Sequence, residues 1–449
     1  MSLVIATTIL YLPIGRKTFD LAAGEEVRAA SSAWLSRVCE QVIEPDAILT
    51  SVDELAAFLR TIDASSVDAV LYQSVTFADG EFVRRALEDV EAPYIVWSVR
   101  EPSTRGRLRL NSLTGGNSTC NVLRNLRHPF SFVFGNPSEE ELQNSLVQQF
   151  GVNRLLRKLR ELTIGVIGEH PPGFFFSDAD ESLLARTFGV RLHKFDLERA
   201  FRECARLPES EYTAAMERAE RQVAGLNRSD ETVRKFAQFY TYVRKQIEAE
   251  RVRAIAVRCW PEFFTELGAA ACSTLSQFTE DGVMSSCESD IHGALSMVIL
   301  HELSGGAAPY LGDLVHVDES RNSVVFWHCG AGAYSLAHPA TGARAGVHPN
   351  RKLGFAMDFG LKPGGVTIFR VSCGPDGYRL LVMKGEALDS PQSFHGTSVE
   401  VRLPSDVRTT LTRLMHEGFE PHFALVYADV SDALVELGRR LGIQTMVLA

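Results

Sequence analysis

The chain has 449 residues, of which 45% are hydrophobic and 23% charged, and its formal net charge is −10. This length exceeds what one hydrophobic core usually serves, so we expect two or three domains, and the composition excludes a disordered chain. The negative charge argues against a nucleic-acid partner, whose phosphates need clustered Lys and Arg. A small-molecule ligand is therefore favoured.

The first third of the sequence alternates short apolar runs with amphipathic stretches. The run LVIATTILYLPI lacks the basic flank of a signal peptide and is shorter than a membrane span of about 20 residues, so we expect a buried first strand and no membrane partner. Further strands are predicted at VDAVLYQS and APYIVWSV, with helices near 24–42 and 79–90. Strands that alternate with helices are typical of parallel βαβ units, which predicts a Rossmann-like, doubly wound α/β domain over 1–160.

A polar segment with Gly115, Gly116 and Asn117 at its centre follows the third of these strands. Two interpretations stay open: a loop that holds an anion on the free N–H groups of a helix N-terminus, or a tight turn with Ser118 or Thr119 as the helix cap. Arginines near the glycines make the segment a candidate site for an anionic part of a substrate. They are Arg107, Arg109, Arg124 and Arg127.

A second α/β series begins at TIGVIGEHPPGFFF and reaches RAIAVRCW, with long helical stretches between 209 and 250. It predicts a second Rossmann-like, doubly wound domain over 161–305. GVIGEH holds only a fragment of the GxGxxG fingerprint, so no NAD site is predicted. Beyond 306, short β-like runs separated by Gly, Pro and Asp turns predict an antiparallel β-barrel or sandwich over 306–449.

Eight cysteines are scattered along the chain without a CxxC pair: Cys39, Cys120, Cys204, Cys259, Cys272, Cys287, Cys329 and Cys373. This usage is typical of reduced thiols in a cytoplasmic protein. Cys259 and Cys287 stand in apolar settings, and we interpret them as small buried fillers rather than nucleophiles.

The stretch CESDIHGALSMVILHEL, residues 287–303, sets Glu288 and Asp290 at the start of a predicted helix. Ser285 or Ser286 can cap that helix, and an acid in its first turn interacts favourably with the helix dipole. At about 100° per residue the two acids are separated by about 200°, so only one of them is expected to face a cleft. The surrounding segment, from Cys259 to Cys329, concentrates the carboxylates and imidazoles that Mn²⁺ and Mg²⁺ take as ligands.

Several segments in combination resemble the L-fucose isomerase family and its relatives among the L-arabinose isomerases. They are CWPEF, STLSQFTEDGVMSSCESDIHGALSM, GDLVHVD, HCG, KPGGVTIFRVS, GEAL, FHGTSVEVRL and GFEPHFALVYAD, and they cover most of residues 250–449. The resemblance implies an aldose–ketose isomerase that acts on a free sugar through an ene-diolate and depends on Mn²⁺, or on another divalent metal such as Mg²⁺ or Co²⁺. It also implies a homo-oligomer, trimeric or larger, in which a neighbouring subunit's N-terminal domain completes the active site.

The resemblance puts the family's metal glutamate at Glu288, its metal aspartate at Asp313 and its late metal histidine at His422. It implies that Glu288 and Asp313 also move the proton between C1 and C2. The first histidine of the family's late pair is replaced here by Pro421, which cannot coordinate a metal. A strand histidine held by a backbone partner is the alternative interpretation of His422.

Two further residues are candidates for substrate contact. His328 stands near the position of another metal histidine of the arabinose isomerases, and we expect it to contact the substrate or a metal ligand. Trp260 can stack on the C–H edges of a sugar or fill the core of the second domain.

Two other functions share these features. A metal-dependent aldolase or lyase reaches the same ene-diolate by retro-aldol cleavage, and a non-catalytic, sugar-binding regulatory protein can use the same fold. The arginines around Gly115 favour a modified or acidic sugar over plain L-fucose as the substrate.

Overall fold

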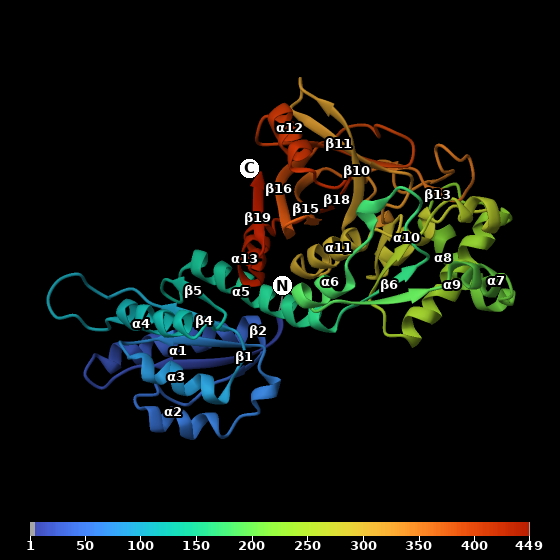
Figure 1. Cartoon of the computed structure of the whole chain (residues 1–449). Helices are drawn as coiled ribbons and strands as arrows, with labels where there is room; N and C mark the ends of the chain where they lie inside the picture. Colours follow the sequence, from blue (N-terminus) through green and yellow to red (C-terminus); the bar gives the residue numbers. More distant parts are fainter. Residues whose placement is uncertain (1–4, 449) are drawn as a thin grey trace. The chain divides into compact units, whose positions relative to one another are not determined.

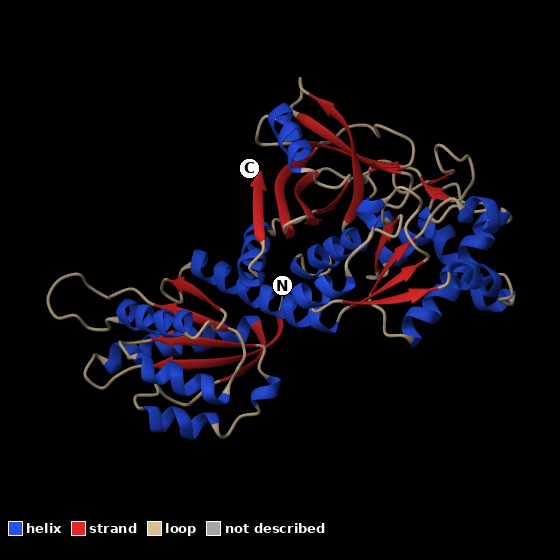
Figure 2. Cartoon of the chain, viewed as in Figure 1, coloured by secondary structure: helices blue, strands red, loops and turns tan. Residues whose placement is uncertain are grey.

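The computed structural model describes residues 5–448, and the chain folds into two compact units, Met1–Arg157 and Lys158–Ala449 (Figure 1). Both units mix helices and strands (Figure 2). The predicted domain limits at 160/161 and 305/306 stay predictions.

The first unit holds a five-stranded parallel sheet in the order β2-β1-β3-β4-β5. Its strands are β1 (Ile5–Ile14), β2 (Cys39–Ile43), β3 (Ala69–Ser74), β4 (Tyr94–Ser98) and β5 (Phe130–Phe134). Successive β1 side chains enter different cores: Ile9 and Tyr11 pack in one cluster, and Leu10 and Leu12 in the other. Both faces of the sheet are thus buried, which confirms the predicted Rossmann-like, parallel arrangement.

The helices of this unit are α1 (Leu21–Val38), α2 (Val52–Leu59), α3 (Gly80–Asp89), α4 (Ser112–Asn125) and most of α5 (Glu140–Glu161), whose last turn belongs to the second unit, with a 3₁₀ turn, η1 (Ala64–Ser66). The first helix was predicted to reach residue 42, but it ends at Val38, and β2 follows at once. Only Cys39 of β2 is fully buried, because β2 lies at the edge of the sheet. An edge strand with few buried side chains lacks the apolar run that identifies a central strand.

Gly115, Gly116 and Asn117 lie inside α4 rather than in a loop, and Asn111 precedes the helix, so the interpretation as a tight turn capped by Ser118 or Thr119 is wrong. A Cβ on Gly116 would collide with Ser98 Oγ, and one on Gly115 would lie 3.1 Å from the backbone nitrogen of Ala78. The two glycines therefore let α4 pack closely on the sheet.

The arginines near these glycines are partly engaged within the first unit. Arg109 Nε lies 2.9 Å from Asp20 Oδ2, and Arg107 Nη2 donates to the carbonyl of Thr18 at 3.2 Å. The proposed anion-binding role of this segment stays a prediction.

The second unit begins with a four-stranded parallel sheet in the order β7-β6-β8-β9. Its strands are β6 (Thr163–Ile167), β7 (Arg191–Phe195), β8 (Ala254–Val257) and β9 (Met284–Cys287). The helices of this part are η2 (Phe175–Ser177), α6 (Glu181–Phe188), α7 (Leu197–Cys204), α8 (Glu209–Gln222), α9 (Glu231–Ala249), η3 (Phe263–Leu267), α10 (Cys272–Glu280) and α11 (Ile291–Leu303). The second predicted parallel, Rossmann-like sheet is confirmed.

The last third of the chain forms an eight-stranded sheet in the order β14-β17-β11-β10-β18-β15-β16-β19, and a further β16–β17 pairing closes six of these strands into a ring. The strands are β10 (Tyr310–Asp318), β11 (Ser323–His328), β14 (Phe359–Gly360), β15 (Gly364–Gly374), β16 (Gly377–Ala387), β17 (Thr397–Arg402), β18 (His422–Val426) and β19 (Gln444–Leu448). A separate two-stranded ribbon joins β12 (Ala345–Gly346) to β13 (Ala356–Met357), and the helices here are η4 (Tyr334–Leu336), α12 (Val407–Glu417) and α13 (Ser431–Leu441).

The expectation of a purely antiparallel sheet needs correction, since β14 runs parallel to β17 and β19 parallel to β16. The parallel β19 follows α13, which the sequence analysis did not predict and which packs on β16 and β19. One hydrophobic core runs through the unit and includes Phe239 of α9, Val257 of β8 and Phe326 of β11. The parallel sheet and the mixed sheet therefore pack on one continuous core, which holds side chains of both sheets in fixed positions.

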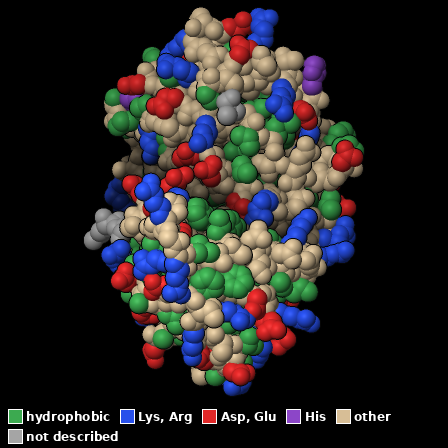
Figure 3. All heavy atoms as spheres, turned by 90° about the vertical axis from the view of Figure 1, so that its left-hand side faces the viewer, with side chains coloured by type: hydrophobic (Ala, Val, Ile, Leu, Met, Phe, Trp, Pro, Cys, Tyr) green, Lys and Arg blue, Asp and Glu red, His purple; other side chains and the backbone are tan. Residues whose placement is uncertain are grey.

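The expectation that nucleic acid is not a partner stays a prediction. On the face drawn in Figure 3, Lys and Arg side chains are interspersed with Asp and Glu. None of the helices in the described residues is long and apolar enough to cross a membrane.

Candidate active site

A pocket of about 310 Å³ opens in the second unit. Three of its residues follow parallel strands directly: Cys259 and Trp260 come after β8, and Glu288 comes after β9. Ligands of parallel α/β sheets bind at such carboxyl ends. The complete lining is Phe174, Cys259, Trp260, Phe264, Cys272, Glu288, Asp313, Trp327, His328, Cys329, His348, Asn350 and Arg351.

A turn between β9 and α11 directs Glu288 into this pocket. Glu288 and Ser289 both have left-handed backbone conformations, with φ of 58° and 55°, and each such residue costs about 1–3 kcal/mol unless its surroundings hold it. Here the backbone N–H of Ser289 donates to Val257 O at 3.0 Å, and its hydroxyl donates to Gly168 O at 3.0 Å. The turn is therefore held from two neighbouring strands.

The predicted helix start is wrong in detail. Ser285 and Ser286 lie in β9, and the cap of α11 is Asp290, whose side chain accepts the N–H of Gly293 at 2.8 Å. Glu288 precedes the helix, so neither capping nor the helix dipole explains it. Glu288 lines the pocket and Asp290 does not, as expected of the pair.

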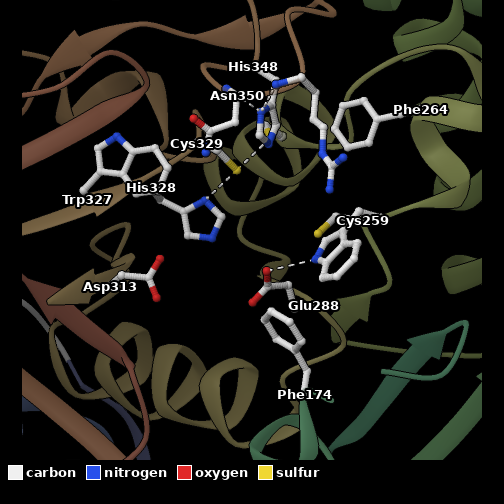
Figure 4. A pocket seen from close by; sticks show the side chains of 13 residues that line it. Phe174, Cys259, Phe264, Glu288, Asp313, Trp327, His328, Cys329, His348 and Asn350 are labelled. Carbon is white, nitrogen blue, oxygen red and sulfur yellow. Dashed lines mark hydrogen bonds between the residues drawn. The ribbon is translucent and has the colours of Figure 1, made fainter. Parts of the chain in front are cut away.

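Three of the predicted residues meet at one imidazole nitrogen. His422 begins β18 and pairs in register with Asp313 of β10, so the sheet itself sets these two side chains side by side. His422 Nε2 lies 3.3 Å from Glu288 Oε2 and 3.5 Å from Asp313 Oδ1. Figure 4 shows the carboxylates of Glu288 and Asp313 facing the same space, with His328 above them.

The other ring nitrogen of His422, Nδ1, is held by the carboxylate of Asp290. Nδ1 lies 2.9 Å from Asp290 Oδ2, and His422 is only 1% exposed. The partners of His422 are thus side chains, so the alternative of a backbone-held strand histidine is wrong. A carboxylate on Nδ1 sets the tautomer that leaves Nε2 as a lone-pair donor.

The donor set fits a divalent cation. With its proton on Nδ1, His422 directs a lone pair from Nε2 toward two carboxylates, and three such groups need a proton or a cation between them. Burial by itself lowers the pKa of His422, but the hydrogen bonds with Asp290 and Glu288 and the charge of Asp313 outweigh it and raise the pKa to about 10. Burial also raises the pKa of Asp313. Two carboxylates and one imidazole are ligands suited to Mn²⁺ and similar ions.

Arg370, and the contact that Asp290 makes with His422, were not predicted from the sequence. Arg370 Nη1 and Nη2 donate to the two oxygens of Asp290 at 2.6 and 3.1 Å, and both side chains have an exposed fraction of 0%. Burial by itself raises the pKa of Asp290, but the charge of Arg370 and the hydrogen bond with His422 hold the pKa far below its usual value. The available signal was an arginine in the middle of the apolar strand sequence VTIFRVSC.

Trp260 and His328 both line the pocket, as expected for substrate contacts. Trp260 Nε1 donates to Glu288 Oε1 at 3.2 Å, so the indole also orients the carboxylate. His328 is buried, its ring centroid lies 5.8 Å from that of His422, and its Nδ1 lies 3.4 Å from Cys329 Sγ. Burial lowers the pKa of His328, but the neighbouring Cys329 and Asp313 outweigh it and raise the pKa.

Two cysteine thiols and an imidazole that lie close together also line this pocket. Cys272 Sγ lies 3.4 Å from Cys329 Sγ, and the ligand atoms of these two residues and of His348 all lie within 4.8 Å of one another. Cys259 and Cys287 are buried nearby. Cys259 lines the pocket and Cys287 does not.

Known proteins are similar to this chain over nearly its whole length. The C-terminal domain family of L-fucose isomerase matches residues 349–448. Sulfoquinovose isomerases from Priestia aryabhattai and from Priestia megaterium (strain ATCC 12872 / QMB1551) are each 66% identical over 441 residues, which is 98% of this chain and 99% of theirs. The sulfoquinovose isomerase of Alkalicoccus urumqiensis is 56% identical over 432 residues, 96% of this chain and 97% of its own.

These relatives and the α/β fold define an enzyme that interconverts an aldose and a ketose, an intramolecular oxidoreductase acting on a sugar. Neither the aldolase nor the non-catalytic regulatory alternative finds support, because each of these relatives is named an isomerase. The chain belongs to the fucose isomerase-like family, in the group of the sulfoquinovose isomerases.

Proposed function

We propose that this protein isomerises sulfoquinovose, a hexose with a sulfonate on C6, to the corresponding 2-ketose, and that it needs Mn²⁺ or another divalent ion such as Mg²⁺ or Co²⁺. The substrate follows from the relatives that match nearly the whole chain. The observation that carries the metal site is the convergence of Glu288 and Asp313 on Nε2 of His422.

In this proposal Glu288, Asp313 and His422 hold the cation. When bound, a divalent ion polarises neighbouring sugar oxygens and contributes several kcal/mol to the reaction. Asp290 keeps the proton on Nδ1 of His422, and Arg370 keeps Asp290 ionised and in place. Both act as positioning residues.

Glu288 and Asp313 move the proton between C2 and C1 through an ene-diolate. The carboxylates approach Nε2 of His422 from different strands and can flank a sugar bound in the pocket. Trp260 fixes the orientation of Glu288 through one oxygen, which suits a base that must meet a carbon-bound proton. Asp313 faces the same space from β10 (Figure 4) and supplies the second carboxylate, which suits the partner in the proton transfer. The roles exchange with the direction of reaction.

The test is turnover by protein stripped with EDTA and reloaded with single metals, on sulfoquinovose, quinovose, D-glucose and L-fucose. We expect one ketose of unchanged carbon count from sulfoquinovose, and we expect Mn²⁺ to restore the activity best. In D₂O the product should carry solvent deuterium at C1. Full activity in the stripped protein would contradict the metal requirement. If only the neutral sugars were turned over, the proposal that sulfoquinovose is the substrate would be contradicted.

We also propose a cytoplasmic homo-oligomer, trimeric or larger. Sedimentation velocity checks the assembly, and a fully active monomer of about 50 kDa, the mass of one chain, would contradict it.

A further inference from the structure

One cation faces the pocket that holds the two candidate catalytic carboxylates. Among the described residues that line this pocket, Arg351 is the single Lys or Arg. Its guanidinium carbon lies 5.7 Å from the ring centroid of Trp260 and 5.8 Å from that of Phe264. No carboxylate in the described part of the chain forms an ion pair with Arg351, whereas Arg258, which follows β8, pairs with Glu262.

The segment that carries Arg351 is held in place. His348 Nδ1 accepts the backbone N–H groups of Asn350 and Arg351 at 3.3 and 3.2 Å, and the His348 ring packs edge-on against Phe264 with centroids 5.0 Å apart. The guanidinium therefore lies over two aromatic rings, and none of its N–H groups donates to another residue among residues 5–448. Cation–π contact positions an arginine without using its N–H donors.

Charges of opposite sign lie beside Trp260 in this pocket. Trp260 donates its N–H to Glu288, while the face of the same indole lies beneath Arg351. Carboxylates repel an anionic substrate, so the anionic group must lie away from them, beside a cation. In a 6-sulfo sugar the sulfonate is at the far end of the molecule from C1 and C2, the carbons that react.

We propose, on the basis of the proposed function, that Arg351 binds the sulfonate of the substrate and so selects an anionic sugar over a neutral one. The planar guanidinium offers paired donors that match two oxygens of a tetrahedral oxyanion. The charged contact is made at C6 and leaves C1 and C2 free to lie between Glu288 and Asp313.

The test compares sulfoquinovose with quinovose, which has a methyl group where the sulfonate would be. In Arg351→Gln we expect kcat/KM for sulfoquinovose to fall about 10- to 100-fold, the usual effect of losing a hydrogen bond to a charged group, with quinovose changed by less than about twofold. Arg351→Lys, which keeps a point charge, recovers part of the loss. Arg413→Gln, an exposed arginine of α12, is the matched control and should behave as wild type.

Quinovose turnover by Arg351→Gln shows that the variant is folded, so an unchanged preference for sulfoquinovose would overturn the proposal. An equal fall in kcat/KM for both sugars would also overturn it, because Arg351 would then not distinguish the sulfonate from a methyl group. Failure of the wild type on sulfoquinovose, with neutral sugars converted, would instead contradict the proposed function.

A second inference concerns the two thiols and the imidazole that line this pocket close to one another. Cys272, Cys329 and His348 offer two thiols and an imidazole within 4.8 Å of one another, and all three line the pocket. Two Cys and one His with an open fourth position form a ligand set for Zn²⁺, whereas Mn²⁺ prefers oxygen and imidazole ligands. This set differs in chemistry from Glu288, Asp313 and His422.

We infer that a thiophilic divalent cation of the Zn²⁺ class binds to Cys272, Cys329 and His348 and inhibits the enzyme. Such an ion occupies the sugar pocket and binds His348, the ring that holds the backbone of Arg351. Hard cations such as Mn²⁺ and thiophilic cations such as Zn²⁺ thus bind to different residues of the same pocket.

Binding of Co²⁺, followed by its thiolate charge-transfer absorption, tests the site without an activity readout. We expect the band in wild type and in Cys120→Ser, a control in the first unit, and its loss in Cys272→Ser. With saturating Mn²⁺, Zn²⁺ should inhibit Cys272→Ser at least about tenfold more weakly than wild type. Absence of the band from wild type, or equal Zn²⁺ inhibition of both proteins, would overturn the inference.

Discussion

Replacing Asp290 by Asn tests whether the buried acid beneath His422 supports the site. Asn has the same shape and can still cap α11, so the change removes chiefly the negative charge that Arg370 and His422 share. Glu420 Oε2 remains 3.5 Å from Arg370 Nε, but the two Nη groups of Arg370 and Nδ1 of His422 lose their charged acceptor. Breaking a buried ion pair by removing one partner costs about 3–5 kcal/mol. For a unit of this size that corresponds to a fall in Tm of about 6–20 °C.

The same substitution should also weaken metal binding. Without a carboxylate on Nδ1, His422 no longer has its tautomer and ring orientation set, and loss of such a partner typically costs about 10- to 100-fold in metal affinity. Differential scanning calorimetry in EDTA measures the first effect, and isothermal titration with Mn²⁺ measures the second.

Glu288→Gln is the matched control, since it alters an acid two residues away that is partly exposed and has no cationic Arg partner. We expect it to leave the Tm in EDTA nearly unchanged while lowering kcat about 10²- to 10⁴-fold. An Asp290→Asn protein with wild-type Tm and Mn²⁺ affinity would refute the reasoning about the buried pair.

Four further outcomes are expected. Asp313→Asn and Glu288→Gln should each lower kcat about 10²- to 10⁴-fold in steady-state assays, as expected for loss of a general acid or base; near-normal kcat in either would remove that residue from the proton transfer. The raised pKa of His422 contributes stability that is complete below about pH 6.5, its unfolded value, and that is lost as the pH rises through about 10, so urea melts of metal-free protein should show a decline over this window. Since Mn²⁺ must displace the proton on Nε2, Mn²⁺ affinity should rise with pH below about 10 and binding should release protons, which titrations in buffers of different ionisation enthalpy detect. Gly116→Ala should destabilise the first unit by about 1–3 kcal/mol through collision with Ser98 Oγ, and Ser98→Gly should restore part of the loss in thermal melts.

Much of the architecture follows from the sequence because hydrophobic patterning is local. Short apolar runs that alternate with amphipathic stretches predicted both parallel sheets, since each strand buried on two faces must be apolar throughout. The resemblance to a sugar isomerase family supplied Glu288, Asp313 and His422 as candidates, and these residues do lie together. The edge strand β2 was missed, because a strand exposed on one side carries no such pattern.

What the tertiary structure alone decided is which distant residues meet. Asp290 and His422 are 132 positions apart, and Asp290 and Arg370 are 80 apart, so no periodicity within one helix or strand can pair them. The register of β10 against β18 sets Asp313 beside His422, and the packing of α11 on β15 and β18 brings Asp290 under both. Gly115 and Gly116, which suggested a turn, lie in a helix, and glycine is needed there because the neighbouring elements leave no room for a Cβ. Local sequence determines which elements form, whereas close packing between elements determines which charges share a buried site.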